Sequence, residues 1–234
     1  MKDYIVYGGC NSKDYGIYAA NVNMFDAPKK DVELIKVPGL NGTLTIDNGR
    51  YQNVSIKYRL YLKGQIHQNI RAFVNRMVSS GYKRLEDSFN PDTFYMARYV
   101  SGLSVSLSDR NTAAFDVEFD RKPQRFLKNG EQSIELTAAG SINNQTEQTS
   151  LPLIRVYGDG TLTIGRISIT IAGSDTYTDI DCELMEAYKD TLATNKNSTI
   201  TLTNGEFPKL LPGANTISFT GITKVIITPR WWIL

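Results

Sequence analysis

The sequence predicts a mainly β protein with one α-helix, and three observations carry this prediction. Most of the chain alternates apolar with polar residues, which is the period of half-buried strands. Residues 65 to 80 instead place their apolar side chains at helical spacing. Residues 129 to 150 are rich in Asn, Gln, Ser and Thr and separate two strand-rich parts, which indicates two domains.

Residues 54 to 62 and 113 to 120 are the clearest strands in the first part of the chain. VSIKYRLYL places five apolar residues on one face, and AAFDVEFD places three apolar residues opposite three carboxylates. We expect the apolar faces to point into a core. The outward carboxylates are Asp116, Glu118 and Asp120.

The helix predicted over residues 65 to 80 is amphipathic. Its apolar positions are Ile66, Ile70, Phe73, Val74, Met77 and Val78. These positions form a single stripe, so the helix is expected to pack on a sheet. Gly81 provides a plausible end to the helix.

Turns and alternating runs dominate the second part of the chain. Residues 161 to 171, TLTIGRISITI, change face at Gly165, which indicates a tight turn or a bulge. YGDG at 157 to 160 is a hairpin signal. Residues 204 to 234 continue with proline–glycine turns and short strands, so we interpret them as the closing strands of a sandwich. The predicted domains are residues 1 to 130 and 150 to 234, with a linker over 131 to 149.

Composition narrows the class of function. The 234 residues are 41% apolar and 21% charged, so a core is feasible, and the net charge of +2 does not favour nucleic acid or an anionic membrane. No stretch reaches the ~20 apolar residues of a membrane span, and the first ten residues lack a signal-peptide pattern. Cys10 and Cys182 lie far apart in sequence and are interpreted as reduced thiols.

Few residues are suited to catalysis. His67 is the sole histidine, which leaves no Ser-His-Asp or Cys-His arrangement beyond it and no usual zinc site. GDGTLTIG lacks the lysine and helix of a phosphate loop. Two carboxylate rows, at 116–120 and 179–183, are interpreted as solvated strand faces rather than as glycosidase acids or a calcium site. No enzyme activity, cofactor or metal is therefore predicted.

Aromatic residues are the remaining candidates for a binding site. Tyrosines gather near the N-terminus, and Trp231 and Trp232 close the chain. Exposed rings suit sugar stacking, whereas rings with a polar tip also suit a sheet border or a subunit interface. Because strand neighbours point to opposite faces, one of the two tryptophans should face the core and the other is a candidate docking aromatic.

Several segments resemble the siphophage distal tail protein family. VPGLNGTL at 37 to 44, followed by a strand after Tyr51, resembles the family's N-terminal motif. The helix, NPDTFYMARYV and AAFDVEFDRKPQRF then follow in the family's order. LPLIRVYGDGTLTI, YTDIDCE and GEFPKLLPGANTISF with PRWW extend the resemblance along nearly the whole chain. None of these segments is a catalytic fingerprint, but their order and spacing are specific as a set.

The resemblance implies a structural role in the virion. The N-terminal β domain with its helix would form a ring of six copies at the end of the tail tube, and the C-terminal domain would be a galectin-like β-sandwich. The ring would join the tail tube protein to the tail-associated lysin and to receptor-binding or baseplate proteins. DNA would pass through its lumen without specific binding, no membrane insertion is expected, and assembly would occur in the bacterial host cytoplasm.

We place the candidate subunit interface in two segments, the VPGLNG loop and residues 121 to 126. The candidate interface residues are Val37, Pro38, Gly39, Leu40, Asn41, Gly42, Arg121, Pro123 and Phe126, and the candidate docking aromatics are Trp231 and Trp232.

Two other functions are kept as hypotheses. The alternative function is a carbohydrate-binding β-sandwich adhesin for host attachment, and the third hypothesis is a β-scaffold glycosidase.

Overall fold

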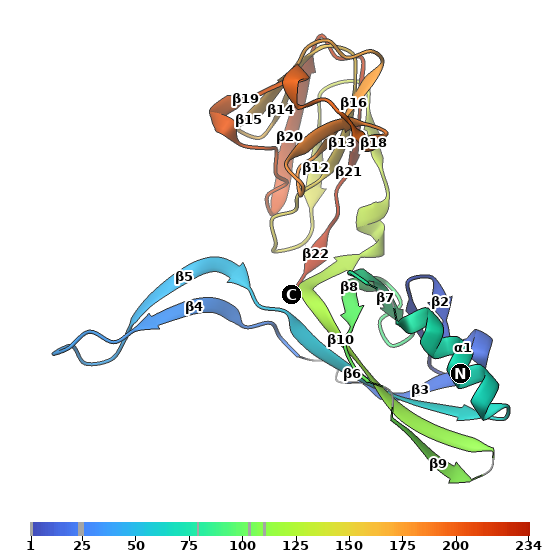
Figure 1. The fold of residues 1–234 in the computed structure, drawn as a ribbon. Helices are drawn as coiled ribbons and strands as arrows, with labels where there is room; N and C mark the ends of the chain where they lie inside the picture. The colour runs from blue at the N-terminus through green and yellow to red at the C-terminus, as the bar shows by residue number, and fades with distance from the viewer. Residues whose placement is uncertain (1, 23–25, 79, 103, 110) are drawn as a thin grey trace. The chain divides into compact units, whose positions relative to one another are not determined.

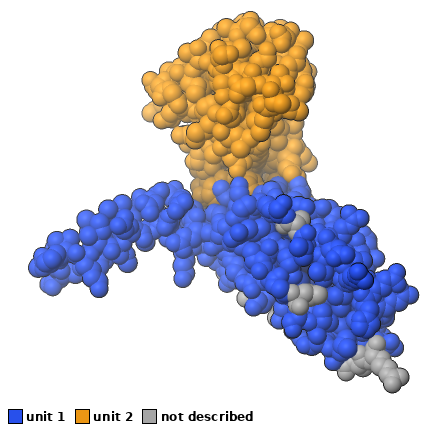
Figure 2. Space-filling view, viewed as in Figure 1, with its two compact units in different colours: residues 1–125, 234 blue, residues 126–233 orange. Residues whose placement is uncertain are grey.

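The computed structural model describes residues 2–22, 26–78, 80–102, 104–109 and 111–234 (Figure 1). The chain divides into two compact units, coloured separately in Figure 2. Unit 1 comprises Met1–Arg125 with Leu234, and unit 2 comprises Phe126–Ile233. Each unit has its own hydrophobic core.

Unit 1 is built on one antiparallel sheet in the order β2-β1-β7-β8-β10-β6-β3, with β9 added beside β10. A short 3-10 helix, η1 (Ser12–Tyr15), connects β2 to β3. The strands are β1 (Ile5–Tyr7), β2 (Cys10–Asn11), β3 (Ile17–Val22), β6 (Val54–Lys63), β7 (Lys83–Asp87), β8 (Thr93–Tyr99), β9 (Val105–Asp109) and β10 (Thr112–Leu127).

The long strands β6 and β10 form the centre of the unit 1 core. They pair antiparallel so that Phe119 lies opposite Ile56 and Val117 lies opposite Tyr58. These four side chains are buried, while the carboxylates between them on β10 point outward. The faces predicted for both strands are confirmed, because period-two alternation is imposed by the pleat itself.

Helix α1 (Ile66–Met77) covers this core with the predicted stripe from Ile66 to Met77, but Val78, also predicted in the stripe, is exposed. Phe73 is buried, and its ring centroid lies 6.4 Å from that of Phe115 on β10. The helix ends earlier than predicted, because Val78 leaves helical geometry while its N–H still bonds the Val74 carbonyl at 2.9 Å. Position 79 of the predicted helix lies outside the described residues.

A buried hydrogen bond joins two strands of unit 1. The Tyr58 hydroxyl donates to Asp87 Oδ2 at 2.8 Å, and both side chains are buried. Burial raises the pKa of Tyr58, so the hydroxyl keeps the proton that it donates. Tyr58→Phe should therefore lower the free energy of unfolding by about 1.5–3 kcal/mol, measured by urea denaturation.

Tyr61→Phe is the matched control, because Tyr61 lies on the outer face of the same strand and its hydroxyl has no hydrogen bond to a described residue. This substitution should change the free energy of unfolding by less than about 0.5 kcal/mol. Equal losses in the two variants would contradict the role given to the Tyr58–Asp87 bond.

Unit 2 is a β-sandwich of a six-stranded sheet, β11-β21-β13-β16-β17-β18, and a five-stranded sheet, β12-β20-β14-β15-β19. Residues from both sheets form one core. The mainly β fold class is therefore confirmed, with one α-helix, in unit 1, within the described ranges.

The elements of unit 2 are η2 (Lys128–Glu131), β11 (Ile134–Leu136), β12 (Gly140–Asn144), β13 (Leu153–Tyr157), β14 (Gly160–Ile164), β15 (Ile167–Ile171), β16 (Tyr177–Asp181), β17 (Glu186–Lys189), β18 (Thr191–Asn195), η3 (Asn197–Thr199), β19 (Ile200–Leu202), η4 (Thr203–Gly205), β20 (Gly213–Thr220), β21 (Lys224–Thr228) and β22 (Trp232–Ile233).

The predicted linker over residues 131 to 149 is wrong. β11 pairs with β21 and β12 pairs with β20, so these residues supply an edge strand to each sheet of unit 2. Few of their side chains face the core; Ile142 is buried and Ile134 is half-buried. Short edge strands with polar outer faces have the same composition as a loop. The Asn-, Gln-, Ser- and Thr-rich composition therefore predicted a linker where the structure has two strands.

The two predicted turns of unit 2 have different outcomes. Gly165 and Arg166 form the turn of a true hairpin, because Ile164 pairs with Ile167 across it. YGDG does not form a hairpin: Tyr157 ends β13 in one sheet and Gly160 begins β14 in the other. This turn instead carries the chain across the sandwich.

The two carboxylate rows also differ. Asp116 lies on an exposed strand face and pairs with Arg59 at 3.0 Å, as a solvated row should. Asp179 and Asp181 are each only 3% exposed, so the prediction of a solvated face is wrong for them. Two arginines compensate their burial, with Arg155 Nε 2.6 Å from Asp179 Oδ1 and Arg230 bound to Asp181.

Candidate interaction surfaces

A two-stranded arm is the most exposed apolar feature of unit 1. It consists of β4 (Lys30–Ile35) and β5 (Leu44–Tyr51), which pair antiparallel and form a sheet of their own within the described chain. Figure 1 shows the arm as a separate ribbon that extends from the main sheet of unit 1. An isolated two-stranded hairpin is marginally stable in water, so this arm is expected to need a partner surface.

The arm exposes apolar side chains on both of its faces. The register pairs Leu34 with Thr45 and Ile35 with Leu44, so successive pairs point to opposite faces. Seven large apolar residues of the arm and its tip are between 37% and 61% exposed. Contiguous exposed apolar surface of this kind typically marks a protein interface. These residues are Val32, Leu34, Ile35, Val37, Leu40, Leu44 and Ile46.

Charged pairs lie at the base of the arm. Lys30 Nζ lies 2.9 Å from Asp47 Oδ2, and Arg50 Nε lies 2.5 Å from Asp31 Oδ2. The hydrogen bond from Lys30 lowers the pKa of Asp47, so this carboxylate is ionised at neutral pH. The ion pairs thus lie at the base, and the apolar residues occupy the outer part towards the tip.

The predicted VPGLNG loop is the tip of this arm. Leu40 N–H bonds the Val37 carbonyl at 3.1 Å, and Gly39 and Gly42 adopt φ values of +82° and +91° that favour glycine. All six residues from Val37 to Gly42 are exposed. The loop is thus accessible, and its role as a subunit interface remains a prediction.

The second predicted interface segment lies on β10, in a different sheet from the arm. Arg121 is 3% exposed; its guanidinium bonds the Asp26 carbonyl at 2.9 Å and lies 4.4 Å from the centre of the Tyr95 ring. Its side chain is used inside unit 1, so its prediction as a surface contact is corrected. Pro123 and Phe126 are half-buried, and their role stays a prediction.

The C-terminal tryptophans occupy different environments in unit 2. Trp231 is 8% exposed and belongs to the core, so it does not offer a freely exposed docking ring. Trp232 is half-buried, and its indole N–H donates to the Thr149 carbonyl at 3.0 Å. Only Trp232 retains the outward position that the sequence assigns to one member of the pair.

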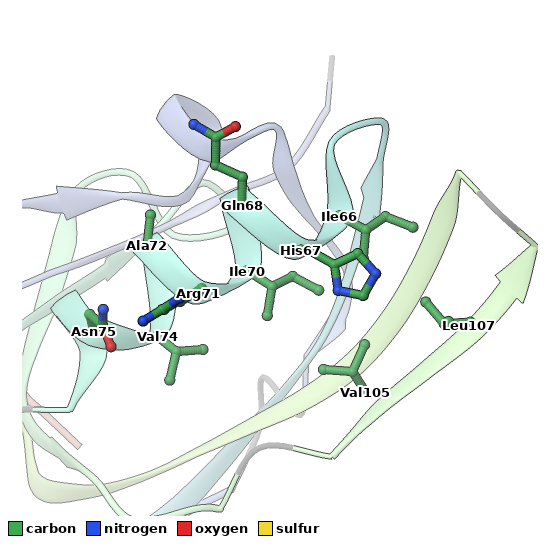
Figure 3. Close-up of a pocket in the computed structure, with 10 residues that line it drawn as sticks. All are labelled: Ile66, His67, Gln68, Ile70, Arg71, Ala72, Val74, Asn75, Val105 and Leu107. Atoms are coloured by element: carbon green, nitrogen blue, oxygen red, sulfur yellow. The ribbon is translucent and has the colours of Figure 1, made fainter.

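An open groove of about 990 Å³ lies between α1 and β9 (Figure 3). Its apolar lining includes Ile70 and Val74 from the helix and Val105 and Leu107 from the strand. Leu107 is largely exposed there. His67, the sole histidine, lies at one end of the groove, with no catalytic partner in its lining. This groove is the second apolar surface of unit 1.

Sequence reasoning missed both the arm strands and the groove. The signal for the arm was present in KDVELI and LTI, two alternating runs on either side of the VPGLNG turn. Alternation shows which residues share a face, but it does not show whether anything covers that face. SVSLS at 104 to 108 alternates like a strand, but it does not show that Leu107 is exposed to the groove, which depends on the placement of β9 opposite α1.

Within the described residues, no group of three His, Cys, Asp or Glu side chains could hold a metal ion. The helix that the structure describes is neither long nor apolar enough to span a membrane. Cys10 and Cys182 are free cysteines in the structure, and Cys182 is buried.

The fold and these surfaces define a two-unit, mainly β protein with an exposed arm. Its fold is similar to the crystal structure of SPP1 Dit (gp 19.1), described as a paradigm of the hub adsorption apparatus in phages that infect Gram-positive bacteria. The TM-score is 0.74 at 12% identity, over 100% of both chains, and at that identity the likeness shows the fold. No protein-family model matches the chain, and neither does any curated protein.

Proposed function

We propose that this protein is the structural hub of a siphophage tail tip, in which six copies form a ring through unit 1. The ring joins the tail tube to the tail-associated lysin and to receptor-binding or baseplate proteins. The full-length likeness to a phage hub protein supports this role. Its site of action is the virion, after assembly in the bacterial host cytoplasm.

The observation that carries the proposal is the arm with two apolar faces. A closed ring needs a head-to-tail contact, in which two different patches of the same chain meet. Unit 1 has two such patches, the arm and the α1–β9 groove. In our proposal the arm of one copy packs into the groove of the next. That contact covers Leu34 and Leu44 of one copy and Leu107 of its neighbour.

The remaining partners follow from the ring. Unit 2, as a separate sandwich, is assigned the outward contacts with the tail-tip proteins. DNA passes through the lumen without specific binding, and the net charge of +2 is compatible with this role because a strongly basic lining would retain DNA. The proposed function is structural, with no reaction assigned to the chain.

Leu34→Asp/Leu44→Asp should convert the hexamer into monomers, measured by light scattering after size exclusion. Each aspartate would place a charge in a contact that excludes water. Burying that charge without a partner of opposite charge costs more free energy than the contact provides. The far-ultraviolet circular dichroism should be unchanged, because both positions are exposed in the single chain.

Thr170→Asp/Thr191→Asp is the control, because it adds the same two charges at exposed positions of unit 2. This variant should assemble like the wild type. A wild-type chain that stays monomeric at micromolar concentration would contradict the ring, and an arm variant that still forms hexamers would contradict the role of the arm.

A further inference from the structure

Unit 2 contains a groove of about 500 Å³ that lies within the size range of small-ligand sites. Its walls come from η2, β11, the end of β12 with the following loop, and the C-terminal segment. None of its lining residues is charged. They are Leu127, Asn129, Gln132, Ile134, Asn143, Gln145, Thr146, Pro229, Trp231 and Ile233.

Four side-chain carboxamides line this groove without a hydrogen-bond partner among the described residues: Asn129, Gln132, Asn143 and Gln145. All four are exposed. Asn144 shows the contrast, because its buried amide donates to the Gln148 and Leu210 carbonyls at 2.9 and 3.2 Å. Each free carboxamide offers two donors and one acceptor.

The other side of the groove is apolar. Pro229 and Ile134 line this side together with Trp231, whose side chain is buried in the core of unit 2. Binding sites for small molecules combine an apolar or aromatic wall with a few placed polar groups. A sugar ring matches this combination, since it has an apolar C–H face and hydroxyls that both donate and accept hydrogen bonds.

Backbone contacts hold the walls of the groove in place. Leu127 N–H donates to the Trp231 carbonyl at 2.8 Å, and Arg230 N–H donates to the Gly130 carbonyl at 2.8 Å. A Cβ on Gly130 would lie 2.3 Å from Trp231 N, so only glycine allows this approach. On the opposite wall, Thr146 Oγ1 donates to Asn144 Oδ1 at 2.8 Å. A rigid groove lowers the entropy lost when a ligand binds.

From these observations we propose that the unit 2 groove binds a neutral glycan. The carboxamides hydrogen-bond its hydroxyls, and the apolar side of the groove, at Pro229 and Ile134, covers one apolar sugar face. The uncharged lining disfavours phosphorylated or carboxylated ligands, whose charge would be desolvated without a counter-charge. This binding activity is additional to the hub role, so either proposal can fail without the other.

The test is a glycan array of neutral and acidic oligosaccharides probed with the full chain, followed by calorimetric titration of the best neutral oligosaccharide. Asn143→Ala/Gln145→Ala should raise its Kd by about tenfold or more, because two side chains that hydrogen-bond the glycan are lost. Both residues are exposed, so the variant should fold.

Gln65→Ala is the control, because it removes an exposed carboxamide of unit 1 that lines neither groove. Its Kd should equal that of the wild type. Retention of acidic glycans alone, no retained glycan, or equal affinity in the groove variant would overturn the proposal. So would binding of peptides in the groove without any glycan.

Discussion

Arg230→Ala should lower the free energy of unfolding of unit 2 by about 3–5 kcal/mol, the cost of breaking a buried ion pair from one side. Arg230 Nη1 and Nη2 each lie 2.8 Å from an oxygen of Asp181, in a two-point contact. Asp181 is almost fully buried. Removal of the guanidinium therefore leaves a carboxylate inside the sandwich without its counter-charge.

The pKa of Asp181 shows how strongly the pair acts. Burial alone would raise this pKa, but the hydrogen bonds and charge of Arg230 outweigh burial and lower it. The backbone N–H groups of Glu183 and Leu184 also donate to Asp181 Oδ1, at 3.0 and 3.2 Å. These backbone N–H groups can offset only part of the stabilisation lost with Arg230, because they carry no full positive charge.

Urea denaturation followed by circular dichroism measures this effect. Arg166→Ala is the control, since Arg166 is exposed on a turn and has no ion pair with a described residue. It should change the free energy of unfolding by less than about 0.5 kcal/mol. Asp181→Ala combined with Arg230→Ala should cost less than the sum of the single losses; strict additivity would contradict the pair.

Gly160→Ala should destabilise unit 2 by about 3 kcal/mol or more, because backbone strain and a steric clash add. Gly160 has φ +152°, and a Cβ there would lie 2.0 Å from the Thr220 carbonyl oxygen. Gly221 is equally close from the other side, where its Cβ would lie 2.6 Å from the Asp159 carbonyl oxygen. Two backbone segments therefore meet where the chain crosses between the sheets.

Gly165→Ala is a control within the same strand pair. Gly165 also has a positive φ of +60°, but nothing lies within 4 Å of the position of its Cβ. Its cost should be limited to the conformational strain of about 1–2 kcal/mol. The difference between the two variants, measured by thermal unfolding, isolates the steric clash, and equal melting temperatures would contradict it.

Local periodicity predicts those parts of this fold that local geometry determines. The α1 stripe from Ile66 to Met77 and the inward face of β6 follow from 3.6- and two-residue periods, and both agree with the structure. The hairpin at Gly165 follows from the change of face. In these elements the buried side is encoded within about ten consecutive residues.

Features that depend on distant residues could not be predicted. Asp181 resembles a solvated acid until Arg230, 49 positions away, is placed beside it. Ile142 belongs to a strand only because β20 pairs with β12. YGDG has hairpin composition, yet its neighbouring strands join different sheets. In each case the deciding contact is tertiary.

Of the candidate interface formed by the β4–β5 arm, the sequence predicts only the tip. The VPGLNG turn is local and could be located from its glycines, whereas the exposure of Leu34 and Leu44 depends on the absence of any covering element over the described arm. Arg121 was misplaced because its burial depends on Tyr95 and Asp26, which are distant in sequence.

Electron cryomicroscopy of the purified 234-residue chain shows whether the arm closes a ring. We expect a closed ring of six copies, with each β4–β5 arm lying in the α1–β9 groove of the neighbouring copy. Single copies at micromolar concentration, or a ring whose arms remain uncovered by any neighbour, would contradict it.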